Sequence, residues 1–121
     1  RQLVDAVLAR CERDGKLYIR LQTSLQAMAS AIAPELEREC KEIRYCKSSM
    51  IEPGEASSHE CVMRLLQMLP EYHALMGDAF TSNLLAERRN ALVELGMTCP
   101  EEWLSIVRQR LFALLSDIDK T

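Results

Sequence analysis

An apolar stripe with heptad spacing, near the start of the chain, constrains the fold more than any other feature. Its two interleaved series are Val4, Cys11, Tyr18, Leu25 and Ile32, and Val7, Asp14, Leu21 and Met28. All of these residues except Asp14 are apolar or weakly polar, and their spacing places them on one face of an α-helix. The stripe predicts one long amphipathic helix over residues 2–33.

The weakest point of this predicted helix is Asp14-Gly15. Glycine inside a helix costs about 1 kcal/mol relative to alanine, and it often ends helices. However, Cys11 and Tyr18 are one full heptad apart, so the stripe keeps its phase across Gly15. We therefore predict a continuous helix with a kink or soft spot at Gly15.

The positions beside the stripe distinguish a coiled coil from a globular bundle. A coiled coil with a charge-selected partner carries Glu and Lys at these positions. Here only Arg10 is charged among Leu3, Leu8, Arg10, Gly15, Leu17, Gln22, Ser24, Ala29 and Ala31. The apolar face is therefore wider than a two-stranded seam, which favours packing in a bundle.

The composition agrees with a helical domain. The chain has 121 residues with few aromatics, glycines or prolines, whereas strands favour aromatic and β-branched residues. We expect a single all-α domain, a bundle of four or five helices, cut from a longer protein. The chain is long enough for one modest core.

Four further helices are expected, over residues 34–47, 58–69, 79–95 and 100–118. Pro34 predicts a joint after the first helix, although a Pro-kinked continuation is an alternative. Residues 48–57, which contain Pro53-Gly54, form the clearest internal loop.

Local signals support three of these helix boundaries. Ser57 to Glu60 and Thr98 to Glu101 are capping boxes, and Gly96 stands where glycine often ends a helix. Pro70 starts a turn, and Asp78 is expected to cap the helix over 79–95.

Charge, hydropathy and cysteine content indicate in which cellular compartment the chain is expected. The net charge is −3 with no strongly basic segment, and no apolar run approaches the roughly 18–20 residues of a membrane span. The number of cysteines is five, an odd count that fits a reducing compartment better than a secreted disulfide scaffold. We expect an intracellular protein, cytoplasmic or nuclear, without membrane contact.

Cys40, Cys46, His59 and Cys61 have side chains that zinc accepts. The common C-x2–4-C pairing is absent, and a regular helix would point Cys40 and Cys46 to different sides. Unligated thiols are the favoured interpretation. A zinc-stabilised adaptor is kept as an alternative.

A basic stripe recurs at every third residue through Arg38, Lys41, Arg44 and Lys47. Four glutamates interleave with it, so the local charge largely cancels. A solvated face with helical ion pairs is the simpler interpretation. A helical module that contacts nucleic acid is the alternative.

Catalytic patterns are missing from the sequence. The histidines are His59 and His73, and Cys61 lies two residues from His59, where helical neighbours point apart. No nucleophile elbow, metalloprotease motif or phosphate loop occurs. We expect no enzyme activity, no cofactor and no small-molecule substrate, and we interpret His73 as a partly exposed helix residue.

The remaining function class is protein–protein interaction, as a scaffold or assembly module that associates with a protein partner or with itself. Its basis is surplus apolar surface, including residues 62–69, which need cover from this domain or from a second chain. The interface residues predicted from the stripe are Leu17, Tyr18, Leu21, Leu25 and Met28.

Overall fold

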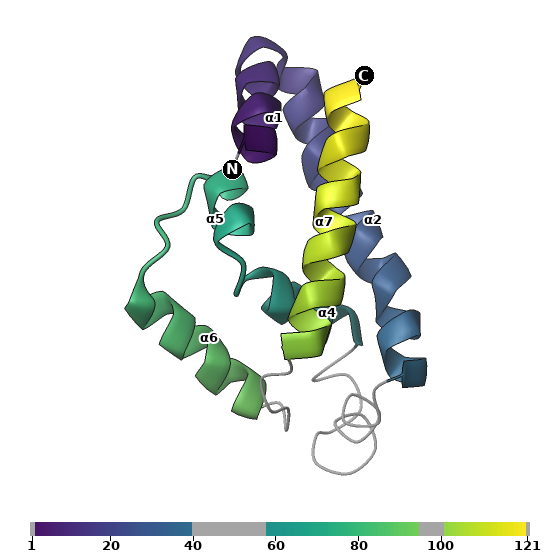
Figure 1. Ribbon diagram of the computed structural model, residues 1–121, viewed down its shortest axis with the longest axis vertical. Helices are drawn as coiled ribbons and strands as arrows, with labels where there is room; N and C mark the ends of the chain where they lie inside the picture. Colours follow the sequence, from purple (N-terminus) through teal and green to yellow (C-terminus); the bar gives the residue numbers. More distant parts are fainter. Residues whose placement is uncertain (1, 40–57, 95–100, 121) are drawn as a thin grey trace.

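The computed structural model describes residues 2–39, 58–94 and 101–120, and within them not the side chains of 36–39, 58, 60, 61 and 92–94. The described elements are all helices, as expected, but within the described residues they number six rather than the predicted four or five (Figure 1). They are α1 (Gln2–Arg13), α2 (Gly15–Glu39), α4 (Ser58–Leu66), α5 (Pro70–Met76), α6 (Ser82–Glu94) and α7 (Glu101–Lys120). The predicted loop 48–57 and both capping boxes include residues outside these ranges.

The apolar stripe belongs to two helices, so the prediction of one continuous helix over 2–33 is wrong. In Figure 1, α1 rises to one end of the molecule and α2 runs back down beside α7. The phase of the stripe is kept because both arms of this hairpin bury the same series of positions. Val4, Val7 and Cys11 are buried from α1, and Leu21 and Leu25 from α2.

Asp14 makes the sharp reversal between the two helices. Its N–H donates to the Arg10 carbonyl at 3.0 Å, which completes the last turn of α1. Its Oδ1 accepts from the N–H of Lys16 at 3.0 Å, and its carbonyl accepts from Leu17 at 3.1 Å. Asp14 therefore ends one helix and caps the next.

Pro34 does not separate two helices, so the predicted joint is wrong and the continuation holds. Helix α2 passes through Pro34 and reaches Glu39. Proline removes its own N–H donor and crowds the carbonyl four residues earlier, and packing of the residues before it offsets this cost. Ile32 and Ala33, directly before it, are both buried.

The core lies where α1, α2, α4 and α7 meet. Helix α2 packs most closely on α4, and α1 on α7. The largest fully buried side chains are Leu21, Ile32, Leu65, Leu66, Leu69, Leu75, Leu111 and Leu115. The apolar 62–69 segment is thus covered within one copy of the chain, since Val62, Leu65, Leu66, Met68 and Leu69 are at most 4% exposed.

The chain leaves the core at the end of α5. Gly77 has φ of 77°, and the N–H groups of Gly77 and Asp78 donate to Ala74 and His73 carbonyls, which is the Schellman arrangement. The next helix is capped by Thr81, whose Oγ1 accepts from the Leu84 N–H at 3.1 Å. Asp78 is therefore not the cap, contrary to the prediction, because α6 begins at Ser82 rather than at residue 79.

Helix α6 lies at the edge of the bundle (Figure 1). None of its described side chains, over residues 82–91, is buried, and Leu84, Leu85 and Ala91 are half-buried. The apolar side chains of α6 are therefore only partly covered by the neighbouring elements.

Candidate functional site

A shallow hollow of about 220 Å³ lies between α6 and the ends of α5 and α7. Its apolar lining comes from Met68, Pro70, Phe80, Leu85 and Leu104. These residues belong to three helices and two connections, and Met68 and Leu104 are buried core side chains that form its floor. The hollow is smaller than the roughly 300–1,000 Å³ of typical small-molecule sites.

The rim of the hollow carries two ion pairs. Arg89 Nη2 lies 3.5 Å from Glu101 Oε1, and both side chains are largely in solvent, at 49% and 75% exposure. Arg108 Nε lies 3.3 Å from Glu71 Oε1, with exposures of 47% and 17%. The apolar floor is thus bordered by two half-exposed guanidinium groups.

Phe80 forms the wall of the hollow and packs against the buried ring of His73. The two ring centroids are 5.3 Å apart, and Tyr72 meets His73 edge-on at 5.9 Å. The Gln67 carbonyl lies 2.6 Å from His73 Nε2, and because a carbonyl only accepts, Nε2 carries the proton. This hydrogen bond fixes the tautomer and the orientation of the ring.

His73 itself is 2% exposed, so its interpretation as a partly exposed residue is wrong. The reason is tertiary, since α5 packs against α1 and the connection to α6 returns Phe80 over the imidazole. Sequence reasoning missed the hollow for the same reason. In the sequence, the signal for this hollow was the group of apolar residues that follows Pro70 in the chain, namely Phe80, Leu84 and Leu85.

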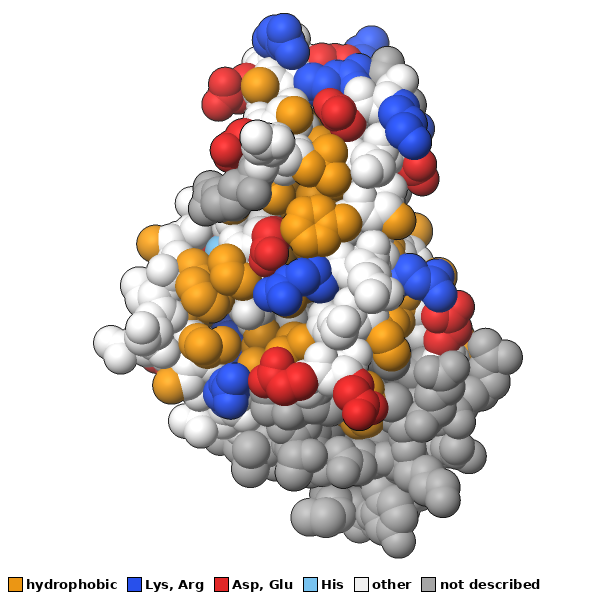
Figure 2. Space-filling view, in the orientation of Figure 1, with side chains coloured by type: hydrophobic (Ala, Val, Ile, Leu, Met, Phe, Trp, Pro, Cys, Tyr) orange, Lys and Arg blue, Asp and Glu red, His pale blue; other side chains and the backbone are white. Residues whose placement is uncertain are grey.

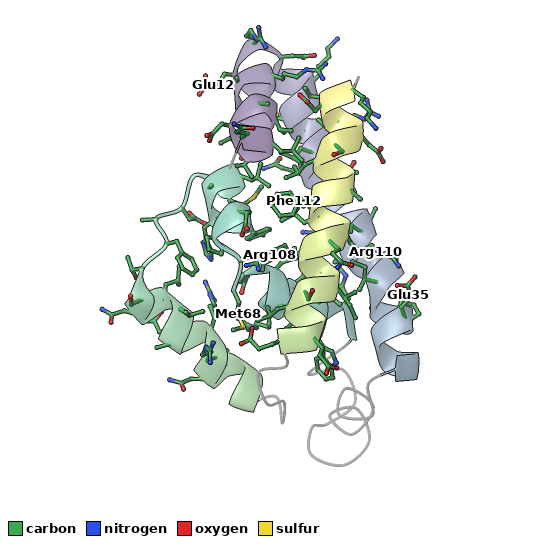
Figure 3. The ribbon with its side chains drawn as sticks, viewed as in Figure 1. Glu12, Glu35, Met68, Arg108, Arg110 and Phe112 are labelled. Carbon is green, nitrogen blue, oxygen red and sulfur yellow. The ribbon has the colours of Figure 1, made fainter. Side chains whose placement is uncertain are left out.

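Side chains around Arg108 extend the site along α7. Figure 3 shows Arg108 and Phe112 on one side of α7, toward α5, with Met68 below them. In the same view, Figure 2 shows apolar side chains above and below a central basic and acidic pair. Phe112 is half-buried against the core. We call the hollow together with Arg108 and Phe112 the α6–α7 face.

The predicted interface residues lie in or beside the core. Leu17, Leu21 and Leu25 are 8%, 0% and 3% exposed, and Tyr18 and Met28 are half-buried against the core. An interface through the three leucines would first have to open contacts within one copy. Among the described side chains of α2, the large apolar one left in solvent is Ile19, at 63% exposure.

The residues of the two alternative sites are largely outside the described ranges. Lys41, Arg44 and Lys47 of the basic stripe lie there, as do Cys40 and Cys46, while the side chains of Arg38 and Cys61 are not described. His59 Nδ1 lies 3.2 Å from Ser30 Oγ, between α4 and α2. Within residues 2–39, 58–94 and 101–120, no group of three or more potential ligands could hold a metal.

The described cysteine Cys11 is buried beside Asp14. Burial raises the pKa of its thiol, the Asp14 carboxylate raises it further, and Arg10 partly opposes both. Because the thiolate is the reactive form, Cys11 is poorly suited to nucleophilic chemistry.

Among the helices that the structure describes, none has the length and apolar character needed to cross a bilayer. Comparison with protein-family models, curated proteins and solved structures finds no match for this chain. Its function is therefore inferred from its own residues.

Proposed function

We propose that this chain is a non-enzymatic protein-interaction module that docks a segment of a partner protein on the α6–α7 face. The observation that supports the proposal is the hollow formed by Met68, Pro70, Phe80, Leu85 and Leu104. A concave apolar floor with a polar rim is the anatomy of an interaction site that takes an anchoring side chain.

The size and construction of the hollow favour a protein partner over a small molecule. Its 220 Å³ suits one bulky side chain, which would leave the rest of the partner on the surrounding surface. Met68 and Leu104 of the floor are buried in the core, and Phe80 of the wall packs on the buried ring of His73. A pre-formed site loses little conformational entropy on binding.

The experiment first selects peptides that bind the folded chain from a displayed library of randomised peptides. The affinity of the selected peptides is then measured for the wild type and for the Leu85→Glu variant. Leu85 is half-buried on α6, so a carboxylate there spoils the apolar lining without entering the core. We expect selected peptides to lose about tenfold in affinity, because the new carboxylate removes apolar contact from the lining and, four residues before Arg89 on the same helix, competes for that guanidinium.

The matched control is Ile19→Glu, which places the same charge on an exposed apolar position of α2. Peptide affinity should be unchanged in this variant, and far-ultraviolet circular dichroism should show both variants folded. Recovery of no peptide that depends on Leu85 would contradict the proposed function.

A further inference from the structure

Resting on this proposed function, we infer the chemistry of the partner: its segment carries a bulky apolar side chain and a carboxylate within about one helical turn of it. The apolar side chain fills the hollow, and the carboxylate binds Arg89 or Arg108 on the rim. Two features of the face support this chemistry, namely the apolar floor and the paired guanidinium groups beside it.

The rim offers hydrogen-bond donors in excess of acceptors. Two arginines and one glutamate line the hollow, and Glu71 beside it pairs with Arg108, so the formal charge of the rim is zero, whereas the whole chain carries −3. In the ion pairs described, each arginine engages its partner through one nitrogen, Nη2 of Arg89 and Nε of Arg108. A guanidinium has five N–H donors in a planar fork that matches a carboxylate.

The existing ion pair at Arg89 can be exchanged at little cost. Arg89 and Glu101 are both exposed and 3.5 Å apart, and such surface pairs contribute only about 0–1 kcal/mol. A partner carboxylate that displaces Glu101 also brings apolar contact, which Glu101 does not supply. Glu71 is different, because it is only 17% exposed and holds Arg108 in place beside the hollow.

A basic partner fits this face less well. Its Lys or Arg would approach Arg89 and Arg108, and like charges brought together at an interface are unfavourable. The two glutamates of the rim, Glu101 and Glu71, are already paired with Arg89 and Arg108.

The test is the amino-acid content of peptides selected from a randomised displayed library, followed by affinity measurements on Arg89→Gln and Arg108→Gln. We expect enrichment of Asp or Glu three or four positions from Leu, Phe or Trp. Each variant should weaken binding by roughly three- to tenfold, and added salt should weaken wild-type binding.

Arg110→Gln is the matched control, because Arg110 is 50% exposed on the same helix but pairs with Glu35 of α2 at 2.7 Å (Figure 3). Its peptide affinity should equal that of the wild type. Peptides that depend on Leu85 but show no acidic enrichment and no arginine dependence would overturn this inference and leave the docking site standing. Selection of no Leu85-dependent peptide would overturn both.

Discussion

Two described glycines differ in what their backbone requires. Gly77 has φ of 77°, whereas Gly15 has no positive φ, and a Cβ at either position would meet nothing within 4 Å. Gly15→Ala should therefore stabilise the fold by about 0.5–1 kcal/mol, since alanine is the better helix former. Gly77→Ala should destabilise it by about 1–2 kcal/mol, because the left-handed conformation strains a Cβ. Urea unfolding of both variants measures the difference, and changes of the same sign would contradict this prediction.

Cys11 and Tyr72 predict how stability depends on pH in the alkaline range. Burial raises the pKa of Cys11 above its ordinary value of 9.0, and burial also raises the pKa of Tyr72 above 10.0, with Asp78 adding to it and Arg88 opposing it. The unfolded chain then loses these protons first. The contribution of these two groups to the free energy of unfolding should be constant below pH 9. It should fall as pH rises through their raised pKa values.

Denaturant titrations between pH 8 and pH 11 measure this decrease. In Cys11→Ala the part of the decrease that begins near pH 9 should be absent, while the part due to Tyr72 remains. A free energy of unfolding that rises over this range would be inconsistent with both assignments.

At the scale of elements, the α1–α2 hairpin depends on Asp14. Asp14→Ala removes the carboxylate that accepts from the Lys16 N–H, and loss of such a cap costs about 0.5–2 kcal/mol. Thermal unfolding should show the loss. Glu12→Ala, at an exposed position of the same hairpin, is the control and should change stability by less than about 0.5 kcal/mol.

The buried face of α2 is a structural element rather than a free surface. Leu21 is 0% exposed, so Leu21→Ala should destabilise the domain by about 2–5 kcal/mol. Leu85→Ala, on the half-buried face of α6, should cost clearly less, which equilibrium unfolding in urea can compare directly. Equal losses would mean that α6 is as tightly packed as α2.

This packing changes the expected result of charge substitutions in the stripe. Leu21→Glu together with Leu25→Glu would bury two carboxylates in the core, so unfolding is the expected outcome. Surface variants such as Leu85→Glu are the informative ones for binding.

At the scale of the whole molecule, the apolar residues of the heptad stripe are covered within one copy of the chain. We therefore expect light scattering on a sizing column, in reducing buffer, to give the 13.8 kDa mass of one chain across a dilution series. A mass near twice this value that persists on dilution would mean that two copies associate through exposed surface. Repeating the measurement with Leu85→Glu and Ile19→Glu would then show which face is used.

Periodicity, composition and the local capping signals predicted the helical class, the apolar faces and the approximate extent of α7, which was predicted over 100–118 and spans Glu101–Lys120. These properties follow from the spacing of residues along one element, which a sequence records directly. The buried face that carries Val4 and Val7 is of this kind, whereas Leu21 was predicted as an interface residue and lies in the core.

Only the tertiary structure decided where helices reverse and where the candidate site lies. A heptad phase records which face is buried but not what covers it, so a straight helix and a hairpin at Asp14 produce the same pattern. Packing against α4 and α7 likewise carried α2 through Pro34, against the local preference of proline. The hollow combines residues from Met68 to Arg108, and no local rule relates positions so far apart in the chain.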